Sequence, residues 1–318
     1  MNTRPPIRSN LLCIGIAILS LALTHQAANA GPLRDRIMER RAAAQEKNEM
    51  LDGDTESTSV TTLPANARVI RNISYGVDDR QRFDVYAPKQ AKGAPIIFMV
   101  HGGAWAKGDK AMKSVVDNKV NRWLPQGFIV ISINYRMLPD TAPIEQARDV
   151  ARALAVAQEK AASWGGDRNK FILMGHSAGA HLIGLLSASP SMATELGASL
   201  WLGGVLLDSA ALNVVQIMQA RHPRLYDQAF GRDTTYWQSA SPFYALMKAG
   251  PPVLLVCSTR REDSCSQAEH FAEKASSLNM KTVVLRENLS HRDINQNLGQ
   301  ESAYTQAVES FLRTLDNR

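Results

Sequence analysis

Short apolar runs alternate with helical stretches along most of this chain, and this alternation constrains the fold more than any other sequence feature. Buried strands joined by crossover helices are typical of a mostly parallel sheet. We expect strands at residues 95–100, 128–133, 171–174, 203–207, 253–257 and 282–285, and helices at 143–163, from 178, at 264–278 and from 301.

Two further predicted strands, at residues 69–75 and 83–87, precede this alternation. The turn between them, GVDD at 76–79, is typical of a hairpin. The sequence therefore predicts an α/β fold with a mostly parallel central sheet, flanking helices and an antiparallel N-terminal hairpin. Residues 209–246 interrupt the alternation, and we interpret them as an excursion on the substrate side of the sheet or an ordinary surface insertion.

The first thirty residues have the pattern of a signal peptide. Arg4 and Arg8 precede an apolar run at 11–23, and the small-residue site Ala28-Asn29-Ala30 follows. The run is shorter than the roughly 20 residues that span a bilayer, so we expect cleavage before Gly31, export to the periplasm or medium, and no stable membrane anchor. The predicted organisation is a signal peptide at 1–30, a flexible, polar leader at 31–67 and one globular domain at 68–318.

The charge and cysteine content restricts the classes of partner. The formal charge of +6 falls to +4 once Arg4 and Arg8 are subtracted, and no cluster of basic residues interleaved with aromatics is present, which argues against nucleic acid. Cleavage leaves Cys257 and Cys265. An oxidising compartment allows them to pair, and two unpaired thiols are the alternative.

The pentapeptide GHSAG at 175–179 matches the G-x-S-x-G pattern of a nucleophile elbow. It follows the predicted strand at 171–174 and opens a helix rich in small residues. A sharp strand-to-helix turn requires glycine two residues before and two residues after the nucleophile, and Gly175 and Gly179 meet this requirement. The context therefore predicts that Ser177 is a nucleophile.

A serine nucleophile requires a base, and in this fold the order along the chain is Ser, acid, His. Of the histidines after Ser177, His181 lies one helical turn later and His270 falls within a predicted helix. His222 precedes any acid on a late strand. His291 follows the last predicted strand, in a loop that can carry it over the edge of the sheet, and it is the predicted base.

The acid is expected in the loop after the strand at 253–257. Asp263 is favoured over Glu262 because it immediately precedes the predicted helix. Asp208, which ends the strand at 203–207, is the main rival. A plain helix N-cap is the alternative role for Asp263.

Backbone N–H groups are expected to bind the oxyanion that develops during acyl transfer. Ala178 follows the nucleophile and supplies one donor. The loop HGGAW at 101–105 follows an early strand, so Gly103 and Ala104 are the other expected donors, with Gly102 shaping the turn.

Two further groups of residues are expected to have supporting roles. Trp105 and Trp237 are candidate walls of a substrate pocket, although aromatic residues near a core are usually part of the core. Arg136 is expected to pair with Asp149 in a structural role.

Several ordered motifs together resemble the hormone-sensitive-lipase-like esterases. They are HGGAW at 101–105, NYR at 134–136, WGGD at 164–167, GHSAG followed by AHL at 175–182, SP at 241–242 and SHRDIN at 290–295. The chain is most similar to the carboxylesterase and feruloyl-esterase-like (BD-FAE type) branch, which is similar to kynurenine formamidases, over roughly 68–315. The third glycine of the family's HGGG loop is replaced by Ala104.

The resemblance implies a catalytic triad of Ser177, Asp263 and His291, an oxyanion loop at Gly102 and Gly103, and Asp208 outside the triad. It implies an α/β-hydrolase fold and hydrolysis of small-molecule carboxylic esters, short-chain or aryl, through an acyl-enzyme, with no metal or organic cofactor. The alternatives are an aryl-formamidase with the same triad and a catalytically silent binding protein, since fold alone does not define function.

Overall fold

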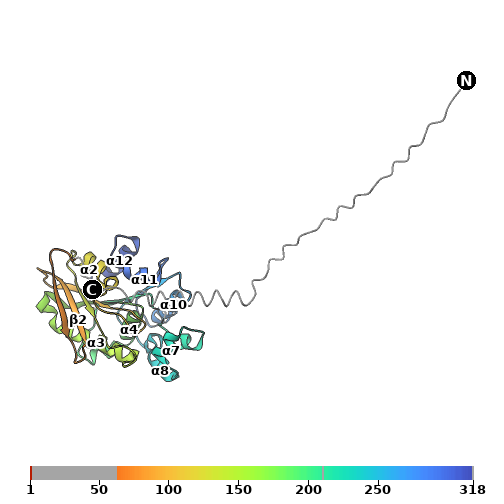
Figure 1. The fold of residues 1–318 in the computed structure, drawn as a ribbon, viewed down its shortest axis with the longest axis horizontal. Coiled ribbons are helices and arrows are strands. Elements are labelled where there is room, and N and C mark those ends of the chain that lie inside the picture. Colours follow the sequence, from red (N-terminus) through yellow and green to blue (C-terminus); the bar gives the residue numbers. More distant parts are fainter. Residues whose placement is uncertain (2–62, 210, 317–318) are drawn as a thin grey trace. The chain divides into compact units, whose positions relative to one another are not determined.

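Eight strands form one sheet in the computed structural model, which describes residues 1, 63–209 and 211–316 (Figure 1). The strands are β1 (Ala67–Ser74), β2 (Arg82–Pro88), β3 (Ala94–Val100), β4 (Ile129–Ile133), β5 (Gly166–His176), β6 (Gly203–Leu207), β7 (Val253–Ser258) and β8 (Thr282–Glu287). Their order in the sheet is β1-β2-β4-β3-β5-β6-β7-β8. The predicted signal peptide and most of the predicted leader lie outside the described residues.

The strand directions confirm the predicted fold class. β1 pairs with β2 and β2 with β4 in antiparallel fashion, whereas β4, β3, β5, β6, β7 and β8 run parallel. The carboxyl ends of these parallel strands therefore lie along one edge of the sheet, where ligands bind in open α/β folds.

Helices flank the sheet, and four of the longer ones were anticipated. The structure contains α2 (Lys113–Trp123), α3 (Pro143–Lys160), the 3-10 helix η1 (Ala161–Trp164), α4 (Ala178–Ala188), α5 (Ser191–Thr194), α6 (Val214–Gln219), α7 (Arg224–Phe230), α8 (Thr234–Ser239), α9 (Pro242–Ala245), α10 (Glu262–Ser277), α11 (His291–Gln296) and α12 (Ala303–Asp316). Within the described part, no helix combines the length and the apolar character needed to cross a bilayer.

The two faces of the sheet pack into two hydrophobic cores, because successive strand side chains point to opposite faces. On β3, Phe98 joins the core that includes side chains of α3, α4 and α10. Its neighbour Met99 joins the other core, which includes side chains of α2, α11 and α12. In Figure 1, α2, α11 and α12 lie together, apart from α3 and α4.

Several helices were not anticipated from the sequence, among them α2 and α11. α2 buries Val116, Val120 and Trp123, which recur at helical spacing on one face. α11 begins at His291, which was expected in a loop. The excursion at 209–246 contains the short helices α6 to α9.

Candidate active site

Ser177 lies at the sharp turn between β5 and α4. Its backbone has φ 54° and ψ −117°, a strained conformation for a residue with a side chain. A Cβ atom on Gly175 would lie 2.6 Å from the backbone of Gly179, and one on Gly179 would lie 2.3 Å from the carbonyl oxygen of Val100. Both glycines are thus required by close backbone contact, as the motif predicts.

Asp208 lies beside Ser177 at the same edge of the sheet. β5 and β6 are neighbours, and the N–H of Ser177 donates to the carbonyl of Leu207 over 2.9 Å. Asp208 follows Leu207 directly and has φ 54°, so its backbone departs from the strand conformation where β6 ends. Its carboxylate is fully buried.

His291 meets this carboxylate from the start of α11. Its Nδ1 donates to Asp208 Oδ2 over 2.6 Å, and the ring is buried. His176, the residue before Ser177, donates from Nε2 to the carbonyl of His291 over 2.9 Å, and the centroids of the two rings are 4.4 Å apart. The His291 ring is therefore held between the ends of β5 and β6.

The structure contradicts Asp263 as the predicted acid. Asp263 is the second residue of α10 and its side chain is exposed, whereas the imidazole of His291 is bonded to Asp208. The physical reason is the strand order: β6 lies between β5 and β7, so the residue that ends β6 is next to the elbow. Asp208 was already the main alternative acid in the sequence, but only the tertiary fold shows which strands are neighbours.

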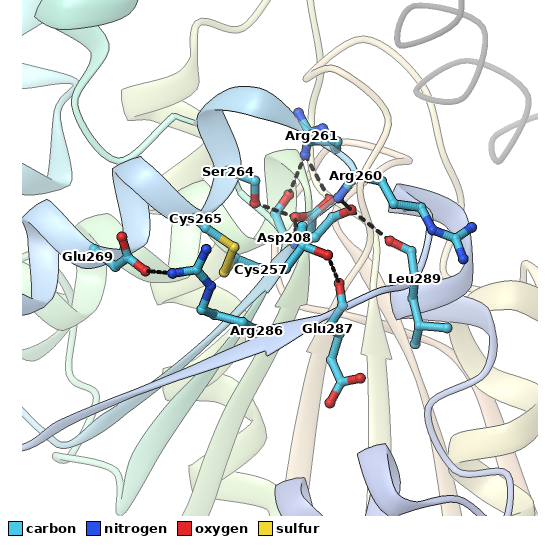
Figure 2. The surroundings of a disulfide bond; sticks show 12 residues. Asp208, Cys257, Arg260, Arg261, Ser264, Cys265, Glu269, Arg286, Glu287 and Leu289 are labelled. Carbon is cyan, nitrogen blue, oxygen red and sulfur yellow. Dashed lines mark hydrogen bonds and ion pairs between the residues drawn. A yellow bond between two sulfur atoms is a disulfide. The ribbon is translucent and has the colours of Figure 1, made fainter.

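Four donors bind the Asp208 carboxylate, and three of them come from residues 258–264. Figure 2 shows Arg261 and Ser264 directed at Asp208. Oδ1 accepts from the N–H of Ser258, over 2.7 Å, and from the hydroxyl of Ser264. Oδ2 accepts from His291 and from Arg261 Nη1, the latter over 2.8 Å. Burial alone would raise the pKa of Asp208, but the Arg261 charge and the bonds from His291 and Ser264 outweigh burial and hold this pKa well below its usual range.

The predicted oxyanion loop lies against the nucleophile. A Cβ atom on Gly102 would be 3.0 Å from the Cβ of Ser177. Gly103 has φ 113°, and Ala104 and Trp105 have φ 49° and 61°, so the loop turns through consecutive left-handed conformations. Ala178 is the first residue of α4, and N–H groups at a helix start have no partner within the helix.

Trp105 is buried and anchors this loop through hydrogen bonds. Only 2% of it is exposed, and its Nε1 donates to His181 Nδ1 over 3.1 Å. Its carbonyl accepts from Gln146 Nε2 and from the N–H of Leu138, each over 2.9 Å. A role for Trp105 as a pocket wall stays a prediction. Trp237 is half-buried in α8, where its indole N–H donates to Gly231, and its role as a wall stays a prediction.

The pairing of Arg136 with Asp149 is confirmed as a structural ion pair. Arg136 donates from Nη2 and Nε to the two carboxylate oxygens over 2.7 and 2.8 Å. Three further residues support the site and were not expected from the sequence: His176, Arg261 and Ser264. Only the position of His176 inside the elbow motif could have drawn attention to it, because the other two act through contacts across the sheet.

The sequence matches a family model and is similar to known esterases. Residues 83–274 match the family model described as BD-FAE. Esterase LipC of Mycobacterium tuberculosis (strain ATCC 25618 / H37Rv) is 28% identical over 243 residues, covering 67% of this chain and 56% of LipC. The probable isoprenylcysteine alpha-carbonyl methylesterase ICME of Oryza sativa subsp. japonica is 34% identical over 116 residues, covering 36% of this chain and 27% of that protein. This chain thus spans less than two thirds of the length of either relative.

Solved structures show the same fold. Esterase B from Lactobacillus rhamnosis superposes with a TM-score of 0.65 at 18% identity, covering 90% of this chain and 94% of that structure. The carboxylesterase EstE1, cloned from a metagenomic library, superposes with a TM-score of 0.63 at 19% identity, covering 88% of this chain and 96% of EstE1.

Proposed function

Because this chain belongs to the BD-FAE family and has the α/β-hydrolase fold, we propose that it is a serine carboxylic-ester hydrolase with a triad of Ser177, His291 and Asp208. The observation that carries the proposal is the 2.6 Å bond from His291 Nδ1 to a buried carboxylate at the strand end next to the elbow. The names of the relatives, an esterase and a methylesterase, support the same reaction class.

The proposed mechanism uses a neutral imidazole. Asp208 accepts a hydrogen bond from the protonated Nδ1 of His291. The other ring nitrogen, Nε2, therefore carries no proton and can act as a base. Nε2 takes the proton of Ser177 Oγ as this oxygen attacks the ester carbonyl, and the oxyanion accepts bonds from the N–H groups of Gly103, Ala104 and Ala178. The tetrahedral intermediate collapses, and His291 returns the proton to the departing alcohol.

The second half of the reaction regenerates the enzyme. His291 takes a proton from water as the water oxygen attacks the acyl-enzyme, the carboxylic acid leaves, and Ser177 regains its proton. We propose short-chain or aryl esters as substrates. The methylesterase name of the rice relative supports an ester with a small alcohol.

We also propose that residues 1–30 direct export and are removed before Gly31. A disulfide joins Cys257 and Cys265, and disulfides persist mainly in oxidising compartments, which supports this proposal.

The triad is tested by p-nitrophenyl ester hydrolysis, from acetate to laurate, by wild type and three variants. Ser177→Ala should lose activity, and Asp208→Asn should lower kcat by about 10⁴-fold because the imidazole loses the partner that fixes its tautomer. Asp263→Asn is the matched control, and we expect it to stay within about twofold of wild type because its side chain is exposed.

The opposite ranking, with activity lost in Asp263→Asn and kept in Asp208→Asn, would restore the acid implied by the family resemblance. A folded wild type that hydrolyses N-formylkynurenine but no ester would establish the formamidase alternative. A folded wild type that fails to react with an organophosphonate probe would establish a silent binding protein.

A further inference from the structure

Residues 257–265, from the end of β7 to the first turn of α10, form a segment closed by a disulfide beside the acid of the proposed triad. Cys257 is in β7 and Cys265 is in the first turn of α10, with their Cα atoms 5.0 Å apart. Both cysteines are buried. In Figure 2 the disulfide lies beside the segment that carries Arg261 and Ser264 to Asp208.

This segment supplies three of the donors to Asp208. They are the Ser258 N–H and Ser264 hydroxyl on Oδ1, and Arg261 Nη1 on Oδ2. Arg261 and Ser264 are both buried, and Arg261 Nη1 also donates to the backbone carbonyl of Asp208 over 3.1 Å. The carboxylate therefore cannot rotate without breaking bonds at both oxygens, and Oδ2 stays directed at His291.

The same guanidinium lies against the base. Arg261 Nη1 is 3.1 Å from His291 Nδ1, and both nitrogens share Asp208 Oδ2 as acceptor. The permanent positive charge of Arg261 at this distance disfavours protonation of the His291 ring, because protonation would place a second positive charge beside it. The negative charge of Asp208 has the opposite effect and favours protonation. Arg261 thus orients the acid and at the same time disfavours protonation of the base.

We infer that Arg261 and Ser264 are positioning residues for Asp208, that the Cys257–Cys265 disulfide holds them in place, and that the Arg261 charge lowers the pH at which His291 gains a proton. This inference rests on the proposed function, because it concerns the acid and base of that triad. The reaction itself is unchanged, and the segment determines how well Asp208 is aligned and over which pH range His291 is neutral.

Other titratable groups also approach His291 and its helix. They are His176 at the end of β5, Lys119 of α2, which donates to the carbonyl of Asn295, and Tyr304 of α12, which donates to that of Ile294. Burial lowers the pKa of His176 and raises that of Tyr304, so both are neutral near pH 7. Lys119 bonds to the far end of α11. Arg261 and Asp208 are both charged and lie within bonding distance of the ring.

The decisive experiment measures the pH at which His291 is protonated, by NMR of its Nδ1 proton and by the acidic limb of kcat/KM. In Arg261→Gln, removal of the positive charge favours the protonated ring, so both midpoints should rise by about one pH unit. At the plateau, kcat should fall about tenfold with KM nearly unchanged, because a misaligned acid affects the chemical step more than binding.

Two matched variants separate charge from fold. Arg261→Lys keeps the charge and should restore the wild-type midpoints, even where its kcat is lower. Arg260→Gln changes the adjacent arginine, which is exposed and donates from Nε to Asn288, and should match wild type in every measurement. Ser264→Ala, which removes a neutral donor, should lower kcat several-fold without moving the midpoints.

The disulfide is tested by combining Cys257→Ala and Cys265→Ala with Arg261→Gln. Without the bridge, Arg261 is already misplaced, so its substitution should change kcat and the NMR midpoint less than in the bridged protein. Fully additive effects would show that the disulfide does not act through Arg261.

Unchanged midpoints in a folded Arg261→Gln variant, shown by its near-ultraviolet circular dichroism, would overturn the inference. The NMR measurement requires no substrate, so the inference is tested even in a protein that hydrolyses no ester. Wild-type inactivity on esters and an unmoved NMR midpoint are separate observations, and the first alone contradicts the proposed function.

Discussion

At the scale of single residues, a buried neutral imidazole anchors the loop that is proposed to bind the oxyanion. His181 accepts from Trp105 Nε1 at Nδ1 and donates from Nε2 to the carbonyl of Ala240 over 2.8 Å, which requires one proton, on Nε2. Burial lowers the pKa of His181 to about 4, so the ring stays neutral near pH 7. Ala104 and Trp105 have positive φ, and contacts such as this one hold them in that conformation.

Replacement of His181 by Phe should therefore affect stability and turnover together. Trp105 loses an acceptor and Ala240 a donor, and leaving two buried groups unpaired should lower the free energy of unfolding by about 2–4 kcal/mol. The kcat for a p-nitrophenyl ester should fall about tenfold, because Ala104, a proposed oxyanion donor, adjoins Trp105. His181→Gln offers both an acceptor and a donor and should retain most of the stability in urea unfolding. An equal loss in both variants would contradict this role for the two hydrogen bonds.

At the scale of elements, the short helix α11 is held at both ends. His291 at its start bonds to Asp208, and near its end the carbonyl of Asn295 accepts from Lys119 Nζ over 2.6 Å. The Ser290 side chain caps its first turn by accepting from the N–H of Asp293. A helix of 6 residues has little intrinsic stability, so α11 depends on these contacts with other elements. This dependence explains why the sequence pattern predicted a loop at His291.

The buried ammonium of Lys119 predicts a specific pH dependence of stability. Burial lowers its pKa from 10.5 to about 7, so between these values the unfolded chain binds more protons than the folded chain. The free energy of unfolding should therefore rise with pH across this window, by about 4 kcal/mol from this group. Urea unfolding at pH 7 and at about pH 10 should show this rise in wild type and a smaller rise in Lys119→Met. Parallel changes in both proteins would exclude Lys119 as the cause.

At the scale of the whole molecule, one sheet joins two cores and the proposed site lies along the edge where its parallel strands end. The chain reaches this edge at the ends of β3, β5 and β6 and again after β8, which explains why residues far apart in the sequence meet there. The disulfide adds a covalent link between β7 and α10 beside the same edge. Its formation depends on the compartment in which the whole protein folds.

Export and disulfide formation are predicted to occur together. Expressed in a bacterium with residues 1–30, the exported protein should begin at Gly31 and contain oxidised Cys257 and Cys265, as intact mass would show. Expressed without residues 1–30 in a reducing cytosol, it should contain free thiols and be less stable by about 2–3 kcal/mol, the entropy of closing so short a loop. Retention of residues 1–30 in the exported protein would contradict the cleavage site.

The sequence alone predicted the features that depend on local sterics and on the periodicity of apolar residues. The alternation of apolar runs and helices predicted the mostly parallel sheet, and the two glycines around Ser177 predicted the elbow, because each pattern reflects a constraint within a few residues. His291 followed from chain order. Only the tertiary structure decided that Asp208 rather than Asp263 meets His291, and that Arg261 lies against both. These choices depend on which strands are neighbours and on the direction of each side chain at a strand end, and neither is encoded within a local segment of the chain.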